Sequence, residues 1–131
     1  MQVNARSICK GIAEGDALVS TDAISFFGSV DAKSGIVVEK GHPLEGKCVK
    51  GKVLVFPRGK GSTVGSYVIL QLKKNGVAPV AIINEEAEPI IAVGAIISEI
   101  PMVDKLEGGA YAKLKDGMKV KVDGTNGAVS F

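Results

Sequence analysis

Two short, continuous apolar runs make the middle of the chain its most regular part. The runs are Val53–Phe56 and Val80–Ile83, and strands buried on both faces of a parallel sheet have this pattern. Between them an apolar residue recurs every four positions from Val64 to Leu72, followed by Asn75-Gly76. This spacing predicts a helix that ends at the Asn-Gly pair. The segment therefore predicts a strand–helix–strand unit with parallel strands and a right-handed crossover.

Both ends of the chain predict strands. Lys119–Asp123 alternates, and a Gly-containing turn separates it from Ala128–Phe131, which predicts two antiparallel strands. Near the start, Arg6–Glu14 and Ala17–Val19 flank a Gly-Asp pair, and we expect a β-hairpin that turns at this pair.

Three shorter segments complete the predicted elements. Ile36–Val38 is expected to be a strand after a structured loop, and Pro101–Val103 another strand. Pro89–Ile97 is strongly apolar with a glycine at position 94, which predicts a strand that passes into a short helix. The predicted fold class is α/β with mixed sheets.

Composition limits what the chain can be. With 131 residues and no internal repeat, it is expected to form a single domain over residues 1–131. Hydrophobic residues make up 46% and charged residues 23%, which is typical of a folded globular domain. The net charge of +2 and the absence of Trp argue against a nucleic-acid partner.

The chain also offers little for membranes, disulfides or metals. Its longest apolar run, Ile90–Ile97, is much shorter than the roughly 20 residues that cross a bilayer. The first residues lack the apolar core of a secretory signal, so a cytoplasmic location is expected. Cys9 and Cys48 are far apart in the sequence, and we expect free thiols and no metal site.

The most informative candidate site joins the first buried strand to the helix. In open α/β sheets, ligands bind at the carboxyl ends of strands. Gly59 and Gly61 allow a ligand to approach the backbone, while Arg58 and Lys60 add positive charge. A guanidinium can also hold a carboxylate or phosphate through two hydrogen bonds. This loop is therefore predicted to bind an anion.

A structural interpretation of the same loop remains open. Ser62 or Thr63 can serve only as the N-cap of the helix, with the basic residues solvated. His42, the only histidine, is expected to be a turn residue. Phe26 and Phe27 are expected to anchor a loop in the core. The three glutamates that follow the second buried strand are expected to form a solvated turn; they are Glu85, Glu86 and Glu88.

Four sequence blocks together resemble the aconitase X small subunit. The blocks read SFFGSVD, HPLEG, GKVLVFPRGKGST and INEEAEPIIAVGAIISEIP, and the match extends from about Ser25 to Val103. The resemblance implies a swivelling three-layer β/β/α domain like the C-terminal domain of aconitases. It also implies that Ser62 is the proton acceptor, where family members often read Gly-Ser-Ser and this chain has Thr63. Substrate-binding roles then fall to the neighbouring residues Arg58, Lys60, Gly61 and Thr63.

The same resemblance implies a heteromeric hydro-lyase. A separate large subunit would bind an iron–sulfur cluster, a group that requires several thiolates, together with most of a small anionic substrate. Separately encoded small subunits resemble those of phosphomevalonate dehydratase, which converts 5-phosphomevalonate to anhydromevalonate phosphate in the archaeal mevalonate pathway, and this substrate is favoured. The alternatives are the small subunit of cis-3-hydroxyproline dehydratase and a non-catalytic docking module of the same fold.

Overall fold

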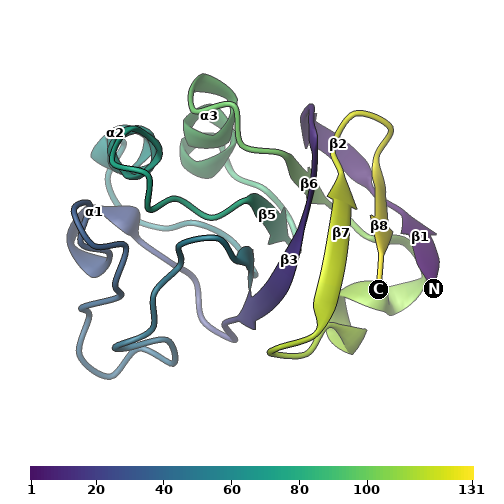
Figure 1. The fold of residues 1–131 in the computed structure, drawn as a ribbon, viewed down its shortest axis with the longest axis horizontal. Coiled ribbons are helices and arrows are strands. Elements are labelled where there is room, and N and C mark those ends of the chain that lie inside the picture. Colours follow the sequence, from purple (N-terminus) through teal and green to yellow (C-terminus); the bar gives the residue numbers. More distant parts are fainter.

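The computed structural model describes all 131 residues, Met1–Phe131, as one eight-stranded sheet with three α-helices on one side (Figure 1). The strands are β1 (Gln2–Asn4), β2 (Arg6–Cys9), β3 (Ile12–Val19), β4 (Val53–Phe56), β5 (Ala81–Asn84), β6 (Met102–Asp104), β7 (Lys119–Asp123) and β8 (Ala128–Ser130). The helices are α1 (Phe26–Ser29), α2 (Val64–Lys74) and α3 (Pro89–Ile97), with a 3₁₀ segment, η1, at Glu107–Lys113. The strand order is β1-β8-β7-β3-β4-β5-β6-β2.

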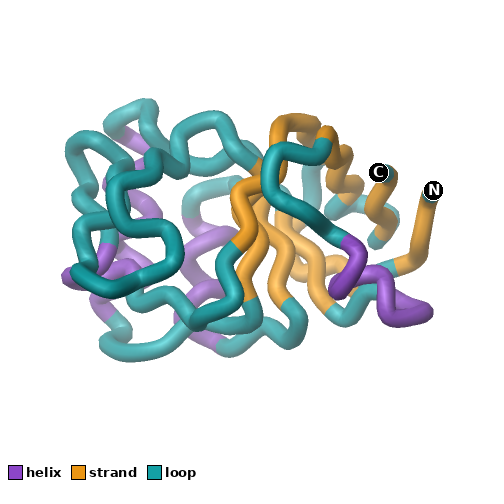
Figure 2. The backbone as a smooth tube through the Cα atoms, turned by 90° about the horizontal axis from the view of Figure 1, so that it is seen from below, coloured by secondary structure: helices purple, strands orange, loops and turns teal.

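Strand β3 connects a parallel layer to an antiparallel layer. Its first part, Ile12–Asp16, pairs antiparallel with β7, and its last part, Ala17–Val19, pairs parallel with β4. Strands β4, β5 and β6 continue the parallel layer. The antiparallel strands β7, β8 and β1 are separated from α1, α2 and α3 by the parallel strands (Figures 1 and 2), whereas η1 lies beside β1. The expected three-layer β/β/α fold is confirmed.

Two hydrophobic cores lie on opposite faces of the parallel layer. Because side chains alternate along a strand, Leu54 and Phe56 of β4 face α2 and α3, whereas Val53 and Val55 face β7 and β8. All four side chains are fully buried. This burial on both faces explains the continuous apolar runs in the sequence.

The most regular predictions are confirmed. Strands β4 and β5 are parallel and flank α2, which ends at Lys74 just before the Asn-Gly pair. Strands β7 and β8 form the predicted antiparallel pair. Strand β6 begins at Met102, one residue later than expected. None of the helices combines the length and apolar character needed to span a bilayer.

The predicted N-terminal hairpin is wrong. Strands β2 and β3 do not pair with each other, because β2 pairs with β6 at the far edge of the sheet. The chain turns at Gly11 rather than at Gly15, and Gly15 lies inside β3. A side chain at Gly15 would place its Cβ 2.9 Å from the carbonyl oxygen of Gly51. The glycine therefore allows close backbone approach and does not mark a turn.

Two further predictions need correction. Pro89–Ile97 is entirely helical, because Glu88 caps its first turn and Pro89 occupies a first-turn position that needs no N–H donor. Ile36–Val38 is not a continuous strand. Ile36 and Val37 form only isolated bridges, to Cys48 and Val30 respectively, within a long irregular segment.

Candidate functional site

The loop between β4 and α2 is held from two sides at the carboxyl end of the parallel strands. On one side Ile24 pairs with Gly59, where Ile24 N donates to Arg58 O at 3.2 Å and Lys60 N donates to Ile24 O at 3.1 Å. On the other side, the backbone amides of Glu85 and Glu86 donate to Pro57 O. The chain that follows β5 and the chain that precedes α1 therefore fix the position of this loop.

Both loop glycines are required by their surroundings. A Cβ at Gly59 would collide with the side chains of Ile91 and Glu88, so the backbone lies directly against the start of α3. Gly61 has φ +91°, and a Cβ there would come within 2.5 Å of Ser25 Oγ. A positive φ of this size favours glycine. The loop that the sequence predicted as an anion site is thus closely packed against α3 at Gly59, and its residues 60–63 are exposed to solvent.

Ser62 and Thr63 are both exposed at the start of α2. The Val64 amide donates to Ser62 Oγ at 3.1 Å, and the Gly65 amide donates to Ser62 O at 2.9 Å. Thr63 occupies the N-cap position, but its side chain accepts no capping hydrogen bond. The capping role expected for one of the two hydroxyls therefore falls to Ser62. The hydrogen bond from the Val64 amide would also stabilise negative charge on Ser62 Oγ if Ser62 acted as a base.

Arg58 and Lys60 are exposed, and neither takes part in an ion pair. Burial and the nearby Glu85 raise the pKa of Tyr111 to about 12. Arg58 lies close enough to Tyr111 to act in the opposite direction and lower this pKa. Lys60 lies near Glu39, whose pKa is lowered mainly by a hydrogen bond from Ser29 and also by Lys60. The loop thus carries two cations that form no ion pair, which suits an anionic ligand.

The segments before and after α1 supply side chains on which the sequence analysis made a prediction. His42 is buried, as expected for a structural turn residue: the Leu44 amide donates to its Nδ1, and its Nε2 lies 3.2 Å from Ala23 O. Phe26 is buried and packs against Phe56, with ring centroids 6.0 Å apart. The expectation for Phe27 is wrong: its backbone is not helical, and its side chain is 56% exposed beside the start of α2.

Residues that sequence reasoning missed also border the loop. A hollow of about 520 Å³ has Pro57, Glu85 and Tyr111 in its lining. Ser25 adjoins Gly61, and its hydroxyl donates to Phe27 O at 3.1 Å. Tyr111 comes from η1, far along the chain, and no local pattern connects it to position 58. Ser25, in contrast, is the first residue of the SFFGSVD block, and the resemblance of this block to the family could have indicated that Ser25 lies near the loop.

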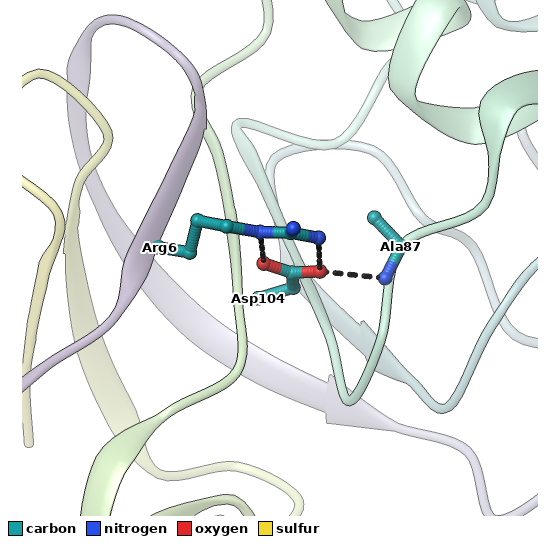
Figure 3. A network of polar contacts seen from close by, with 3 residues as sticks. All are labelled: Arg6, Ala87 and Asp104. Carbon is teal, nitrogen blue, oxygen red and sulfur yellow. Dashed lines mark hydrogen bonds and ion pairs between the residues drawn. The ribbon is translucent and has the colours of Figure 1, made fainter.

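The neighbouring turn between β5 and α3 is structural. Glu88 accepts hydrogen bonds from the amides of Ile90 and Ile91 at 2.9 and 2.7 Å, so the expectation that it is solvated is wrong. The amide of Ala87 donates to Asp104 at 2.7 Å. Asp104 is fully buried and accepts two hydrogen bonds from Arg6, at 2.8 and 2.6 Å (Figure 3). This arrangement ties β2, β6 and the turn together.

The thiols and acidic side chains do not fit an iron–sulfur cluster or another metal. Cys9 is buried, which raises the pKa of its thiol, and its sulfur contacts the carbonyl oxygens of Lys10 and Ala95. Cys48 is half-buried, and both thiols are free. No three His, Cys, Asp or Glu side chains lie close enough to hold an ion. A cluster needs a set of thiolates, and this chain does not provide one.

Comparison with known proteins gives full-length matches. A family model described as the aconitase X swivel domain matches residues 2–131. A protein of Methanosarcina acetivorans named phosphomevalonate dehydratase small subunit is 65% identical over all of this chain and 91% of its own length. One of the same name from Methanocella arvoryzae is also 65% identical, over all of this chain and 99% of its length. The crystal structure of Thermococcus kodakaraensis aconitase X, in its holo-form, superposes with a TM-score of 0.94 at 54% identity, covering 99% of this chain and 97% of that one.

Proposed function

The chain belongs to the aconitase X swivel-domain family, and we propose that it is the small subunit of phosphomevalonate dehydratase, a hydro-lyase completed by a large subunit. The observation that carries this proposal is 65% identity to proteins of that name along the whole chain. The reaction removes a proton and a hydroxide from neighbouring carbons of 5-phosphomevalonate. The products are anhydromevalonate phosphate and water.

Ser62 is the proton acceptor in this proposal. A serine hydroxyl is a poor base in water, so its surroundings must favour the alkoxide. The Val64 amide donates to its Oγ, and the first turn of α2 adds partial positive charge. Arg58 and Lys60 contribute full charges nearby. An alkoxide at Ser62 takes the proton from the substrate carbon and becomes the hydroxyl, and the alkoxide forms again when this proton passes to water after the product leaves.

The rest of the loop binds the substrate. 5-Phosphomevalonate carries a phosphate and a carboxylate, and the loop offers two cations without ion-pair partners, Arg58 and Lys60. A guanidinium suits a two-point hydrogen bond to either group. Gly61 leaves the backbone accessible, and the Thr63 hydroxyl accepts no capping bond and is free to contact substrate.

The large subunit supplies what this chain lacks. We assign an iron–sulfur cluster and most of the substrate contacts to it, because the thiols of this chain are too few and too far apart to hold a cluster. The role of this chain is then to present Ser62 and its cations to a substrate that the partner holds. Proton transfer needs approach to hydrogen-bond distance, so the loop must face the partner.

The test is co-expression of this chain with the large subunit that pairs with the Methanosarcina acetivorans relative, in the absence of oxygen. The assembled pair is assayed with 5-phosphomevalonate and with cis-3-hydroxyproline, and each subunit is assayed alone. We expect water loss from 5-phosphomevalonate by the pair only. Preference for cis-3-hydroxyproline would replace the substrate assignment, and turnover by this chain alone would contradict the division of labour. A fully assembled but inactive pair would favour a docking module.

A further inference from the structure

Helix α3 carries no charged or polar side chain. Its sequence, PIIAVGAII, is apolar on every face, and a helix of that kind is normally buried all round. Only one side of it is buried here, where Ile91, Gly94 and Ala95 face the core. On the outer side, Val93 is 47% and Ile97 is 43% exposed. The sequence of α3 is therefore suited to a position covered by another protein surface.

The outer side of α3 continues onto α2 and α1. A Cβ at Gly65 of α2 would lie 3.3 Å from the side chain of Ile90 and 3.9 Å from the backbone nitrogen of Phe27, so α2 is close to both α3 and α1. Val64, Tyr67 and Phe27 are 43%, 64% and 56% exposed. We name the following five side chains the apolar face: Phe27, Val64, Tyr67, Val93 and Ile97. No charged residue lines the groove of about 380 Å³ between α2 and α3.

The apolar face is continuous with the candidate catalytic loop. Thr63 lines the groove together with Tyr67, Ile90 and Ile97. Ser62 is the residue before Thr63, and its Oγ accepts from the amide of Val64, which belongs to the face. A surface that covers the groove therefore ends beside Ser62. The exposed cations Arg58 and Lys60 lie on the same loop as Ser62, so the loop that adjoins this edge of the face carries positive charge while the centre of the face is apolar.

We propose that the apolar face is the surface on which the large subunit docks, bringing its bound anionic substrate to the basic edge beside Ser62. This inference rests on the proposed function, since it takes its occupant from the division into small and large subunits. An apolar centre with a polar rim is the usual composition of a stable interface. The partner surface would be apolar opposite α2 and α3, with the anionic group opposite Arg58 and Lys60.

A second copy of this chain fits the same face less well. A copy of the apolar face contains no acidic side chain that could pair with Arg58 and Lys60. A second copy would also close the groove beside Ser62 without supplying any metal-binding group, because this chain has none. Apolar exposure elsewhere, such as Ile12 at 59% on β3, lies outside the groove.

The test places a lysine on the face and measures association with the large subunit that pairs with the Methanosarcina acetivorans relative. The variants are Val93→Lys and Tyr67→Lys, and the matched control is Ile12→Lys, where the new charge faces Asp123 on β7. We expect each face variant to weaken association by at least tenfold in titration calorimetry, with circular dichroism unchanged. The control should bind like the wild type. Wild-type affinity in both face variants would overturn the proposal.

A second measurement needs no variant. Hydroxyl-radical footprinting of the wild-type chain, with and without the large subunit, reports the exposure of Tyr67 and Phe27 directly. We expect both to become protected in the pair, while the control position Ile12 does not. Unchanged labelling of both aromatics would contradict the inference, as would a dimer of this chain alone that Val93→Lys dissociates. A pair that protects Tyr67 yet dehydrates neither test substrate would uphold the docking surface and overturn the proposed function.

Discussion

Two turns at the same edge of the sheet use their polar groups in opposite ways. The turn from β5 to α3 bonds its carboxylate to its own backbone, since Glu88 accepts from two amides of the first turn of α3. The turn from β4 to α2 has a Thr63 side chain that caps nothing, and its Arg58 and Lys60 form no ion pair.

The difference separates a turn whose positive helix end is satisfied internally from one whose positive helix end remains available. Both turns follow a buried parallel strand, and both start a helix whose free amides favour negative charge. In the first turn an internal carboxylate already satisfies that preference. In the second turn only the neutral Ser62 hydroxyl meets the Val64 amide, so the positive end of α2 and two cations remain available to an external anion. The contrast is the main structural support for placing substrate at Arg58–Thr63.

The largest effect on stability is expected where the two turns touch. In Gly59→Ala the new methyl group collides with Ile91 and Glu88 at the start of α3, and overpacking of this kind costs about 1 to 3 kcal/mol. Chemical denaturation should show a lower free energy of unfolding by that amount. An unchanged stability would mean that the loop moves freely away from α3, and the two turns would not be coupled as described.

Glu88→Ala should show the structural character of the β5–α3 turn. The substitution removes the acceptor for the amides of Ile90 and Ile91, and loss of an N-cap costs about 0.5 to 2 kcal/mol. Thermal unfolding of the isolated chain measures this loss. Glu86→Ala is the control, because Glu86 is exposed and its side chain accepts no hydrogen bond. Equal effects of the two substitutions would contradict the capping role.

Arg58→Lys should affect substrate binding more than the chemical step. Lysine keeps the charge and loses the two-point hydrogen bond. We expect KM to rise by about tenfold, which corresponds to roughly 1.4 kcal/mol, with kcat little changed. Steady-state kinetics of the assembled pair provides the measurement. An unaltered KM would place Arg58 outside the substrate site. The β4–α2 turn would then differ less from the β5–α3 turn in the positive charge that it offers to an external anion.

The smallest expected effect concerns a third turn, between β7 and β8. Hydrogen bonds from Asn126 and from the amide of Thr125 lower the pKa of Asp123. A lowered pKa in the folded state stabilises the protein above the unfolded pKa of about 3.9 and loses this contribution as the pH falls through the folded value.

Thermal unfolding at several pH values tests this link. Asp123→Asn should lower the midpoint slightly at pH 7, and the difference from the wild type should shrink as the pH falls below about 4. Ser62→Ala should leave this acid dependence unaltered, because its turn holds no such carboxylate. A difference for Asp123→Asn that stays constant with pH would contradict the assignment.

Sequence alone predicted the elements whose pattern is local. The apolar runs of β4 and β5 and the four-residue spacing of α2 gave the correct parallel unit, and with it the loop that contains Ser62. The alternation in β7 and β8 was equally informative. These segments carry their own signal because each pairs or packs with a neighbour that is close in sequence.

The errors arose where contacts are distant. Gly15 resembles a turn residue, yet its role depends on the carbonyl of Gly51. Helix α3 was predicted in part as a strand, because its all-apolar sequence lacks the polar face that identifies a helix. Tyr111 approaches Arg58 only through the fold. A single sequence contains no record of such pairings.

Turnover of the assembled Ser62→Ala complex tests the central claim most directly. If Ser62 is the proton acceptor, assembly and substrate binding persist while kcat falls by about 10² to 10⁴, the usual contribution of general acid–base catalysis. Thr63→Ala, one residue away, should have a much milder effect. If Ser62 only caps α2, the assembled variant keeps near-normal turnover and loses about 0.5 to 2 kcal/mol of stability. That result, or loss of activity in Thr63→Ala alone, would contradict the account.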